Sequence, residues 1–376
     1  MDPPSLVRIQ APQFVCRGVR TSALFFLRKM KLSIVLLAAG HGTRMNSKRQ
    51  KVLHEVGGKP MLLHSFEAAE AVADLKPVVV VGAGESGARQ LLGQRAKYAV
   101  QEERLGTGHA TLMARPLLES RADQVLVTYG DMPLLRAQTL RRLAQRQKDE
   151  DAAIAMLSVR GDPNTSFGRV LRGEEGRVAE IVEVAQAKRR PDAERLLAIR
   201  ELNAGVYCFD ASWMWPRLRN LPVRQARSGQ EYYLTDMVAM AVEEGKPVEA
   251  LVAEDADECL GAGTRQELAE VERALRRRIN RRWLEAGVTL IDPRTTYIDD
   301  GVRIGQDTVI WPNTYLQGQT VVGEDCVLGP NTIVRDATLG DGCHAEQVVL
   351  DGVTLAAGTT TPPLSHLKAD EGSAGS

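Results

Sequence analysis

Between residues 34 and 252, short apolar runs alternate with stretches in which apolar residues recur at helical spacing. The runs that predict strands are residues 34–37, 78–81, 124–128, 153–159, 205–209 and 248–252. Helical patterns such as 62–72 and 137–148 lie between them. Buried strands that alternate with amphipathic helices are typical of the α/β class, with a mostly parallel, doubly wound, Rossmann-like sheet. Because ligands bind beyond the carboxyl ends of such strands, the residues that follow each strand are the first candidates for function.

After Val288 the pattern changes to a repeat of six residues. An aliphatic residue recurs every six positions, and a small or β-branched residue follows four positions after each one. The two sets are Ile298, Ile304, Ile310, Leu316, Val322, Leu328 and Val334, and Val302, Thr308, Thr314, Thr320, Cys326, Thr332 and Thr338. This hexapeptide repeat predicts a short left-handed parallel β-helix over 289–356, with three hexads to a triangular coil and the aliphatic side chains pointing inward. The repeat slips at Leu339 and recovers only loosely at Val349, so we expect about three coils.

Three other segments surround an α/β domain that we expect over 30–260. Residues 261–288 predict a connector helix, because acidic residues flank its basic block at helical spacing and favour a solvated face over a nucleic-acid contact. Residues 1–29 are basic and poor in acids, so they are either a targeting peptide or a disordered extension from a misplaced start, and we favour the extension. Residues 357–376 are rich in Thr, Pro, Gly and Ser, so we expect a disordered tail.

Composition and charge exclude several classes of protein. Of the 376 residues 44% are hydrophobic, an ordinary share for a globular protein, which excludes a disordered or collagen-like chain. The 48 basic residues balance the 48 acidic ones, so an anionic ligand must be held by local charge, and nothing favours nucleic acid or an anionic membrane. No apolar run is long enough to predict a membrane span. The five cysteines show no C-x-x-C spacing, which favours reduced thiols in a cytoplasmic protein.

The loop after the first predicted strand carries the strongest candidate chemistry. Gly40 and Gly42 follow two alanines there, and small residues let the backbone approach a nucleotide so that its N–H groups can cradle phosphate oxygens. Arg44 and Lys51 follow the glycines, and we interpret both as phosphate-binding rather than as a solvated patch. The spacing differs from that of a Walker P-loop, which needs Gly-Lys-Ser/Thr at the start of a helix.

A carboxylate, Asp131, follows the predicted strand 124–128 after Tyr129 and Gly130. At the carboxyl end of that strand it would face the same crevice as the glycine loop. Mg²⁺ prefers one or two carboxylates together with substrate phosphates, so we favour a metal site at Asp131. The alternative is an aspartate that caps the following turn.

The sequence Leu-Ala-Ala-Gly-His-Gly-Thr-Arg-Met at 37–45, followed by Lys-Val-Leu-His at 51–54, resembles the sugar-1-phosphate nucleotidyltransferases. Further motifs follow in the order of that family, at Gln101 and at 105–110, 129–134, 167–169, 181–183, 201–205 and 230–236. The chain is most similar to the bacterial bifunctional N-acetylglucosamine-1-phosphate uridylyltransferase/glucosamine-1-phosphate acetyltransferases, over about 31–355 and including the β-helix.

The resemblance implies an enzyme that uses Mg²⁺ to join UTP to N-acetylglucosamine 1-phosphate. Its products would be pyrophosphate and UDP-N-acetylglucosamine, a precursor of cell-wall peptidoglycan. Both substrates are anionic, so catalysis depends on positioning and charge neutralisation. Two alternatives stay open. One is another nucleotide or sugar, such as dTTP or glucose 1-phosphate, and the other is a non-catalytic paralogue that binds sugar nucleotides.

The resemblance also implies roles for individual residues. Arg44 would bind the triphosphate, Lys51 would lie between the reacting phosphates, and Asp131 would hold the metal. Nucleotide-binding positions would be Leu37, Ala38, Ala39, Gly40, Gly42, Gln101, Gly106, Thr107, Tyr129 and Gly130. The sugar would contact Gly168, Glu183 and Asn203.

The chain departs from the family pattern in three places. Gly263 stands where the family has a second metal-binding Asn, so either Asp131, phosphates and water hold the metal, or Asp255 or Asp257 substitutes. Val-Ala-Gln at 184–186 replaces the basic and acidic residues that follow the sugar-contacting Glu in the family. The short β-helix lacks the His, Lys and Tyr set of the acetyltransferase site, so we expect no acetyltransferase activity. The family packs its β-helices side by side, which predicts a homotrimer.

Overall fold

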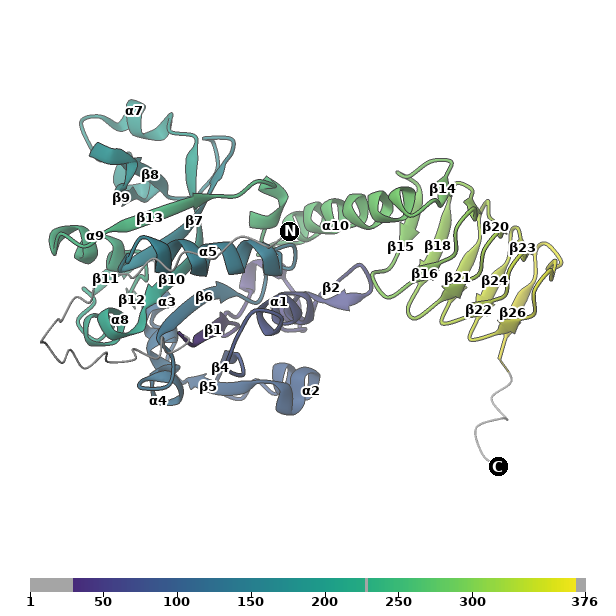
Figure 1. Cartoon of the computed structure of the whole chain (residues 1–376), viewed down its shortest axis with the longest axis horizontal. Helices are drawn as coiled ribbons and strands as arrows, with labels where there is room; N and C mark the ends of the chain where they lie inside the picture. The colour runs from purple at the N-terminus through teal and green to yellow at the C-terminus, as the bar shows by residue number, and fades with distance from the viewer. Residues whose placement is uncertain (1–29, 227–228, 370–376) are drawn as a thin grey trace, which may run out of the picture. The chain divides into compact units, whose positions relative to one another are not determined.

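The computed structural model describes residues 30–226 and 229–369. All the helices and strands that follow belong to one compact unit, residues 31–376, and Figure 1 shows their order along the chain. The expected extension over 1–29 lies outside the described residues, as do residues 370–376 of the expected tail.

The α/β domain is built on one sheet with the strand order β13-β7-β10-β6-β1-β4-β5. These strands are β1 (Leu32–Leu37), β4 (Val78–Gly82), β5 (Lys97–Gln101), β6 (Gln124–Tyr129), β7 (Ile154–Arg160), β10 (Glu201–Asp210) and β13 (Val248–Val252). Strand β10 runs antiparallel to β6 and β7, and every other neighbouring pair along this order is parallel. The prediction of a mostly parallel sheet and all six of its predicted strands are therefore confirmed.

The sheet is covered on both faces, which explains why interior strands such as β1 and β4 are almost entirely apolar. Along β1, Val35 and Leu37 join a core that contains Trp213 of α8 (Ala211–Leu218). Ile34 and Leu36 join a second core with α1 (Met61–Glu70) and α5 (Ala137–Asp149). Alternate residues of a strand point to opposite faces, so a strand buried on both sides loses the alternation of polar and apolar residues.

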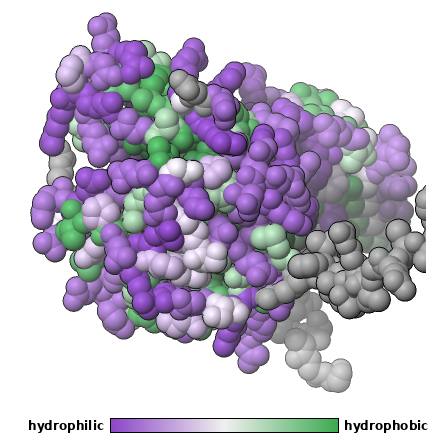
Figure 2. Space-filling view, turned by 60° about the vertical axis from the view of Figure 1, so that its left-hand side comes forward, coloured by the Kyte–Doolittle hydropathy of each residue, from purple (hydrophilic) through white to green (hydrophobic). Residues whose placement is uncertain are grey.

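The helices of the α/β domain alternate with the strands as the hydrophobic pattern predicts. They are α1 (Met61–Glu70), α2 (Gly87–Leu92), α3 (Gly106–Met113), α4 (Arg115–Leu118), α5 (Ala137–Asp149), α6 (Val184–Ala187), α7 (Ala193–Leu197), α8 (Ala211–Leu218) and α9 (Asp236–Glu243). Short strands complete the domain: β2 (Glu55–Val56), β3 (Lys59–Pro60), β8 (Arg169–Arg172), β9 (Val178–Val182), β11 (Arg224–Ala226) and β12 (Gly229–Glu231). Hydrophilic residues cover most of the face shown in Figure 2. Within the described ranges, no helix combines the length and the apolar character that crossing a membrane requires.

The predicted connector helix is α10 (Arg265–Glu285), which begins and ends within the expected 261–288. Thr264 caps it, since its Oγ1 accepts a hydrogen bond from the backbone N–H of Glu267 at 3.1 Å. Its residues Ala274, Leu275 and Ile279 lie in the same apolar core as the β-helix. The helix is therefore packed on one side rather than solvated all round.

The C-terminal region is a parallel β-helix with three faces, as predicted. Its strands are β14 (Thr289–Leu290), β15 (Thr296–Ile298), β16 (Arg303–Ile304), β17 (Val309–Ile310), β18 (Thr314–Gln317), β19 (Val321–Val322), β20 (Val327–Leu328), β21 (Ile333–Arg335), β22 (Thr338–Leu339), β23 (His344–Ala345), β24 (Val349–Asp351), β25 (Thr354–Leu355) and β26 (His366–Lys368). The inward positions Ile310, Leu316, Leu328 and Val334 are fully buried. The slip of the repeat is absorbed by shorter coils, because paired residues are 18 apart at Val309 and Val327 but 16 apart at Ile333 and Val349.

The expectation of a disordered tail is wrong for residues 357–369. Strand β26 pairs in parallel with β24, and Thr360 bridges to His344. Over the described residues, the β-helix therefore has four coils of three strands and part of a fifth, not three coils. The small and polar residues that suggested disorder form the corners of this coil, while Leu367 packs against the core.

A hairpin of the α/β domain touches the first coil of the β-helix. It consists of β2 and β3 with the turn Gly57-Gly58, and it starts two residues after a short 3₁₀ helix, η2 (Lys51–Leu53). The Gly57 carbonyl accepts from the Asp300 N–H at 2.9 Å, and Lys59 Nζ lies 2.7 Å from Asp300 Oδ2. The segment that carries Lys51 is thus connected to the β-helix through the hairpin.

Candidate active site

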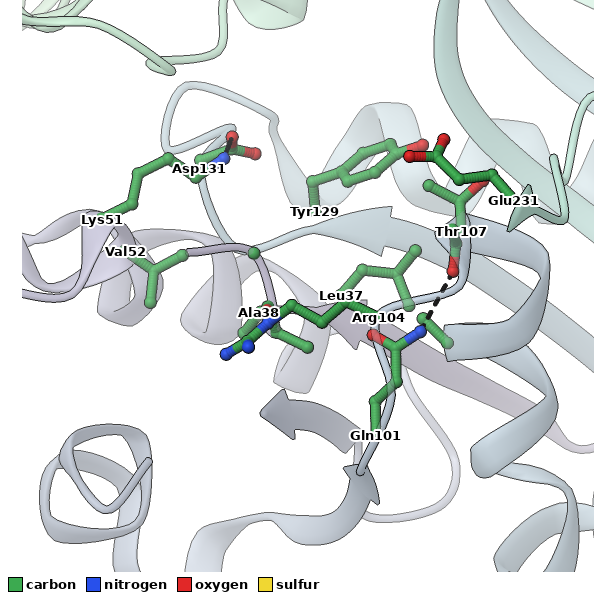
Figure 3. A pocket seen from close by; sticks show the side chains of 14 residues that line it. Leu37, Ala38, Lys51, Val52, Gln101, Arg104, Thr107, Tyr129, Asp131 and Glu231 are labelled. Carbon is green, nitrogen blue, oxygen red and sulfur yellow. Dashed lines mark hydrogen bonds and ion pairs between the residues drawn. The ribbon is translucent and has the colours of Figure 1, made fainter. Parts of the chain in front are cut away.

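A cavity of about 270 Å³ lies where the loops after β1, β5 and β6 meet the start of α3 (Figure 3). It is lined by Leu37, Ala38, Ala39, Gly40, Lys51, Val52, Gln101, Arg104, Gly106, Thr107, Ala110, Tyr129, Asp131 and Glu231. Eight of the ten predicted nucleotide positions are in this set, together with Lys51 and Asp131, whereas Gly42 and Gly130 are not. These ten predicted residues thus converge on one edge of the parallel sheet, whereas Arg44 does not line the cavity.

Glycine is required at position 42 for two reasons. Its φ is +64°, in the left-handed region, and a Cβ there would lie 2.5 Å from the Cβ of Lys51. The lysine side chain therefore packs directly against the loop. Gly42, although it does not line the cavity, decides where Lys51 lies.

Lys51 Nζ forms an ion pair and hydrogen bond with Asp131 Oδ2. Both side chains are largely buried, with exposed fractions of 18% and 17%. The candidate phosphate-binding cation and the candidate metal ligand therefore neutralise each other across the crevice. A phosphate that attracts Lys51 would free the carboxylate to accept a cation.

The residues around Asp131 fit a magnesium ion that keeps water and phosphate ligands. The Ala262 N–H donates to the Asp131 carbonyl at 3.1 Å, so the segment of Gly263 lies beside Asp131. A Cβ at Gly263 would lie 2.8 Å from Arg44 Nη2, so the guanidinium fills the space next to this position. One carboxylate with substrate phosphates is a usual magnesium environment. Within the described ranges, no group of three or more His, Cys, Asp or Glu residues could hold a metal by itself.

The substitution by Asp255 or Asp257 finds no support in the structure. Asp255 Oδ2 lies 2.6 Å from Arg136 Nη2 and 3.3 Å from Arg278 Nη2. Asp257 Oδ2 lies 2.8 Å from Arg277 Nη2. Both carboxylates are thus engaged with arginines, two of them on α10.

The far end of the cavity is polar but closely packed. Gln101 is buried, and its Nε2 donates to the Gly106 carbonyl at 3.2 Å. Gly106 has a φ of +92°, and a Cβ there would lie 2.7 Å from the Tyr232 carbonyl. The Thr107 hydroxyl accepts from the Leu234 N–H at 3.0 Å. The motif 230–236 thus packs against the loop 105–108 and is hydrogen-bonded to it.

The three predicted sugar positions also come together. The Asn203 N–H donates to the Gly168 carbonyl at 2.8 Å, and a Cβ at Gly168 would lie 3.2 Å from Glu183 Oε1. Tyr129 connects this trio to the cavity, because it lines the cavity and a Cβ at Gly205 would lie 3.0 Å from its ring. The trio itself does not line the cavity, so the candidate sugar site is adjacent to it.

Burial controls the protonation of two groups at this junction. It raises the pKa of the Glu183 carboxyl; the negative charge of Asp236 adds to this shift, and the positive charge of Arg169 opposes it. Burial also raises the pKa of Tyr129 far above its ordinary value, and Asp131 and Glu183 add to the effect. The Tyr129 hydroxyl therefore stays protonated and can act as a hydrogen-bond donor.

Sequence reasoning missed Arg104 and Glu231, which both line the cavity. Arg104 follows β5, a strand that the hydrophobic pattern did not predict because Lys97, Tyr98 and Val100 are only half buried at the edge of the sheet. The rule that function follows strand ends would have found Arg104 if β5 had been recognised.

Comparison with known proteins first defines the class of the chain. Residues 34–289 match the family model of a MobA-like NTP transferase domain, and residues 301–336 match bacterial transferase hexapeptide (six repeats). A solved CMP:2-keto-3-deoxy-manno-octonic acid synthetase complexed with CTP has a TM-score of 0.50 and 18% identity, over 66% of this chain and 99% of that chain. At that identity the likeness shows the fold alone. The chain is a nucleotidyltransferase of Rossmann-like fold joined to a left-handed hexapeptide β-helix.

Closer relatives define the family. The bifunctional protein GlmU of Pelotomaculum thermopropionicum is 44% identical over 340 residues, which are 90% of this chain and 73% of the relative. That of Exiguobacterium sibiricum is 40% identical over 334 residues, with 89% and 73% covered. The chain therefore belongs to the GlmU family, and this confirms the resemblance drawn from its motifs.

Proposed function

We propose that the protein is a uridylyltransferase that joins UTP to N-acetylglucosamine 1-phosphate and releases pyrophosphate. The observation that carries the proposal is the position of Tyr129 between the cavity that holds Lys51 and Asp131 and the trio that includes Glu183. A nucleotide in the cavity and a sugar at the trio would bring their phosphates together near Lys51.

The reaction forms one bond and breaks one bond at the α-phosphorus of UTP. A phosphate oxygen of the sugar phosphate attacks this phosphorus, and the bond to the bridging oxygen of pyrophosphate breaks. Two unit charges about 4 Å apart repel by about 4 kcal/mol at an effective dielectric constant of 20. Lys51 would reduce this repulsion, and Arg44 would bind the triphosphate. Mg²⁺ held by Asp131 would supply further neutralisation of the phosphate charge.

The polar groups of the cavity suit a pyrimidine base. The side-chain Oε1 of Gln101 can accept a hydrogen bond from the N–H on the edge of uracil, while its Nε2 is engaged with the Gly106 carbonyl and lies 3.1 Å from His109 Nδ1. For the sugar, the Glu183 carboxylate can accept from hydroxyls, and the amide of Asn203 can do both. Gln186, one of the residues that departs from the family, accepts from the Glu183 N–H at 3.3 Å and so steadies this position.

The test is a pyrophosphate-release assay over a matrix of nucleoside triphosphates and sugar 1-phosphates, with and without Mg²⁺. We expect the highest turnover with UTP and N-acetylglucosamine 1-phosphate, and only with the metal. Higher turnover with dTTP or glucose 1-phosphate would favour the alternative substrates. An absence of turnover in every combination would support the non-catalytic alternative instead.

We also propose that the 376-residue chain lacks acetyltransferase activity. The proposal rests on the residues of the β-helix, in which we find no set of His, Lys and Tyr that resembles the acetyltransferase site of the family. Acetyl-CoA and glucosamine 1-phosphate, incubated with the purified protein, should give no N-acetylated product above background. Enzyme-dependent product would contradict this.

A homotrimer through the β-helix is a further proposal. Ile291 and Trp311 lie at equivalent points of successive coils and are 49% and 43% exposed, so they offer apolar surface for packing against another copy. Light scattering should give three times the mass of the chain, and Trp311→Glu should shift the protein toward the monomer. A monomeric wild type at micromolar concentration would refute the trimer.

A further inference from the structure

Arg104, which follows β5, reaches the loop that follows β1. Its Nε donates to the Ala39 carbonyl at 2.5 Å, and its Nη1 lies 2.5 Å from His41 Nε2. Its Nη2 donates to Glu85 Oε1 at 2.8 Å. Figure 3 shows this side chain extending along the cavity toward Ala38. One guanidinium thus connects the ends of three strands, β1, β4 and β5.

Glu85 is held in turn by the segment that precedes Lys51. Its Oε2 accepts from Gln50 Nε2 at 2.8 Å and from the Gly82 N–H at 2.9 Å. Gln50 Nε2 also lies 3.3 Å from the Ala38 carbonyl. We call the side chains of Arg104, Glu85 and Gln50 the Arg104 network. The network is hydrogen-bonded at one end to the Ala39 carbonyl, through Arg104, and at the other end to the Ala38 carbonyl, through Gln50.

The backbone leaves room for this network. A Cβ at Gly82, the last residue of β4, would overlap Arg104 Nη2 and would lie 2.8 Å from Glu85 Oε2. The Arg104 and Glu85 side chains are 29% and 16% exposed, so the ion pair is largely shielded from solvent. The arrangement is therefore a built contact rather than a surface pair.

The network fixes the direction of groups that face the cavity. A peptide unit is planar, so holding the Ala39 carbonyl sets the direction of the Gly40 N–H on the opposite side of the same unit. Gly40 lines the cavity, and its N–H is one of the groups expected to meet the nucleotide. An unrestrained loop would have to be ordered by the ligand, at a cost in affinity.

We propose that Arg104 is a positioning residue for nucleotide binding, which orders the loop 38–42 and is itself oriented by Glu85 and Gln50. The inference rests on the proposed function in taking a nucleoside triphosphate as the ligand of the cavity. Arg104 would act on nucleotide affinity and not on the chemical step, so the effects of Arg104 variants can be distinguished from those of Lys51 variants.

The experiment measures UTP binding by calorimetry without sugar phosphate, and the KM of each substrate in the pyrophosphate assay. Arg104→Ala should raise the Kd and KM for UTP about tenfold or more, because a charge-assisted contact and the order of the loop are lost. The kcat and the KM for the sugar phosphate should stay within about twofold, as expected when only ground-state binding of one substrate weakens. Arg104→Lys should restore part of the affinity, since an ammonium cannot reproduce the fork of the guanidinium.

Matched variants exclude a merely structural effect. Glu85→Gln should weaken UTP binding less, and the double variant should bind about as weakly as Arg104→Ala alone, because the two residues act as one unit. Gly82→Ala should give the same pattern without removing any charge. Arg95→Ala is the control, because it breaks an exposed ion pair with Glu70, at 2.6 Å, outside the cavity. It should change neither the Kd nor the KM for UTP. Melting temperatures identify any variant that is misfolded. If Arg104→Ala is misfolded, the UTP affinities of Gly82→Ala and Arg104→Lys test the inference in its place.

Unchanged UTP affinity in Arg104→Ala and Gly82→Ala would overturn the inference, and so would equal losses for both substrates. A wild type that binds UTP without turnover would contradict the proposed function and leave the Kd comparison intact. A wild type that binds no nucleoside triphosphate would overturn both.

Discussion

The α/β domain and the β-helix both place glycines under close contacts, but the contacts are of different kinds. A Cβ at Gly42 would meet the side chain of one residue, Lys51. A Cβ at Gly305 would lie 2.5 Å from the backbone of Gly323 in the next coil, and one at Gly323 would meet the coil after that. The first contact is individual and positions a functional group. The second is repeated and lets the coils stack.

This difference predicts separate consequences for mutation. The contacts around the cavity of the α/β domain occur once each, at strand ends, so losing one should remove function and leave stability nearly unchanged. Contacts in the β-helix form a continuous core, so losing one should reduce stability and leave the cavity intact. The hairpin at Gly57-Gly58 is where the two regions meet, and it should show an intermediate response.

The largest expected effect is that of Lys51→Ala. Turnover should fall about 10³-fold, because the proposed role of Lys51 is to stabilise charge in the transition state. Melting temperature should change little. Lys48→Ala, at a neighbouring exposed position, is the control and should retain most activity. A Lys51→Ala enzyme with normal turnover would remove the basis for the assignment.

The next effect is that of Leu316→Ala in the β-helix. Leu316 is fully buried, so the substitution should cost about 2–5 kcal/mol of unfolding free energy by leaving a cavity. Denaturant unfolding followed in the β-helix measures the loss, and the KM for UTP should be unaffected. Val321→Ala, at a site that is 38% exposed, should cost far less. A large change in UTP binding in Leu316→Ala would break the separation between the two regions.

Removing the hairpin contact should have a smaller effect. Lys59→Met loses the pairs with Asp300 at 2.7 Å and Glu67 at 3.0 Å, which are partly shielded, and should cost about 1 kcal/mol at neutral pH. Burial opposes ionisation of Asp300, but the hydrogen bond and charge of Lys59 outweigh it and lower the pKa of Asp300. This stabilisation is present above the unfolded pKa and is lost as the pH falls through the lower folded pKa.

The difference between wild type and Lys59→Met should therefore shrink below the ordinary Asp value of 3.8. Unfolding free energies at several pH values measure it. Arg49→Met removes an exposed pair with Glu55 in the same region and should change stability by less than about 0.5 kcal/mol. A pH-independent difference for Lys59→Met would show that packing, not charge, joins the hairpin to the β-helix.

The smallest expected effect is the pH dependence of sugar binding. Because burial raises the pKa of Glu183, its ionised form opposes folding, and its contribution to stability decreases as the pH rises through the raised pKa. In the proposed function an ionised Glu183 would accept hydrogen bonds from the sugar, so the KM for the sugar phosphate should rise severalfold as the pH falls through that pKa.

Glu183→Gln provides the control for this effect, because the substrate phosphate also titrates near pH 6. The variant should have a higher KM at neutral pH and a flatter profile, and the difference between the two profiles measures the contribution of Glu183. The KM for UTP, measured over the same pH range, should not change with the titration of the Glu183 carboxyl. Identical profiles in wild type and variant would contradict the role of its charge.

The sequence predicted the interior strands of the sheet and the edge strand β13, but missed the opposite edge strand, β5. The run 78–81 is continuous in Val and lies between two neighbouring strands, whereas β5 mixes Lys97 and Tyr98 with apolar residues because one side is open. The missed strand led directly to the missed Arg104. The prediction of a disordered tail failed for a related reason. The corners of a β-helix coil are rich in small and polar residues, which is also the composition of disordered chains.

The sequence by itself determined the two regions, the period of the β-helix and the identity of the glycine loop. These depend on local spacing, because inward positions and strand ends recur at fixed intervals along the chain. Only the tertiary structure decided which distant side chains meet: Lys51 with Asp131, Arg44 beside Gly263, and Arg104 with Glu85. Such contacts follow from strand order and loop conformation, and these are set by the packing of the whole domain.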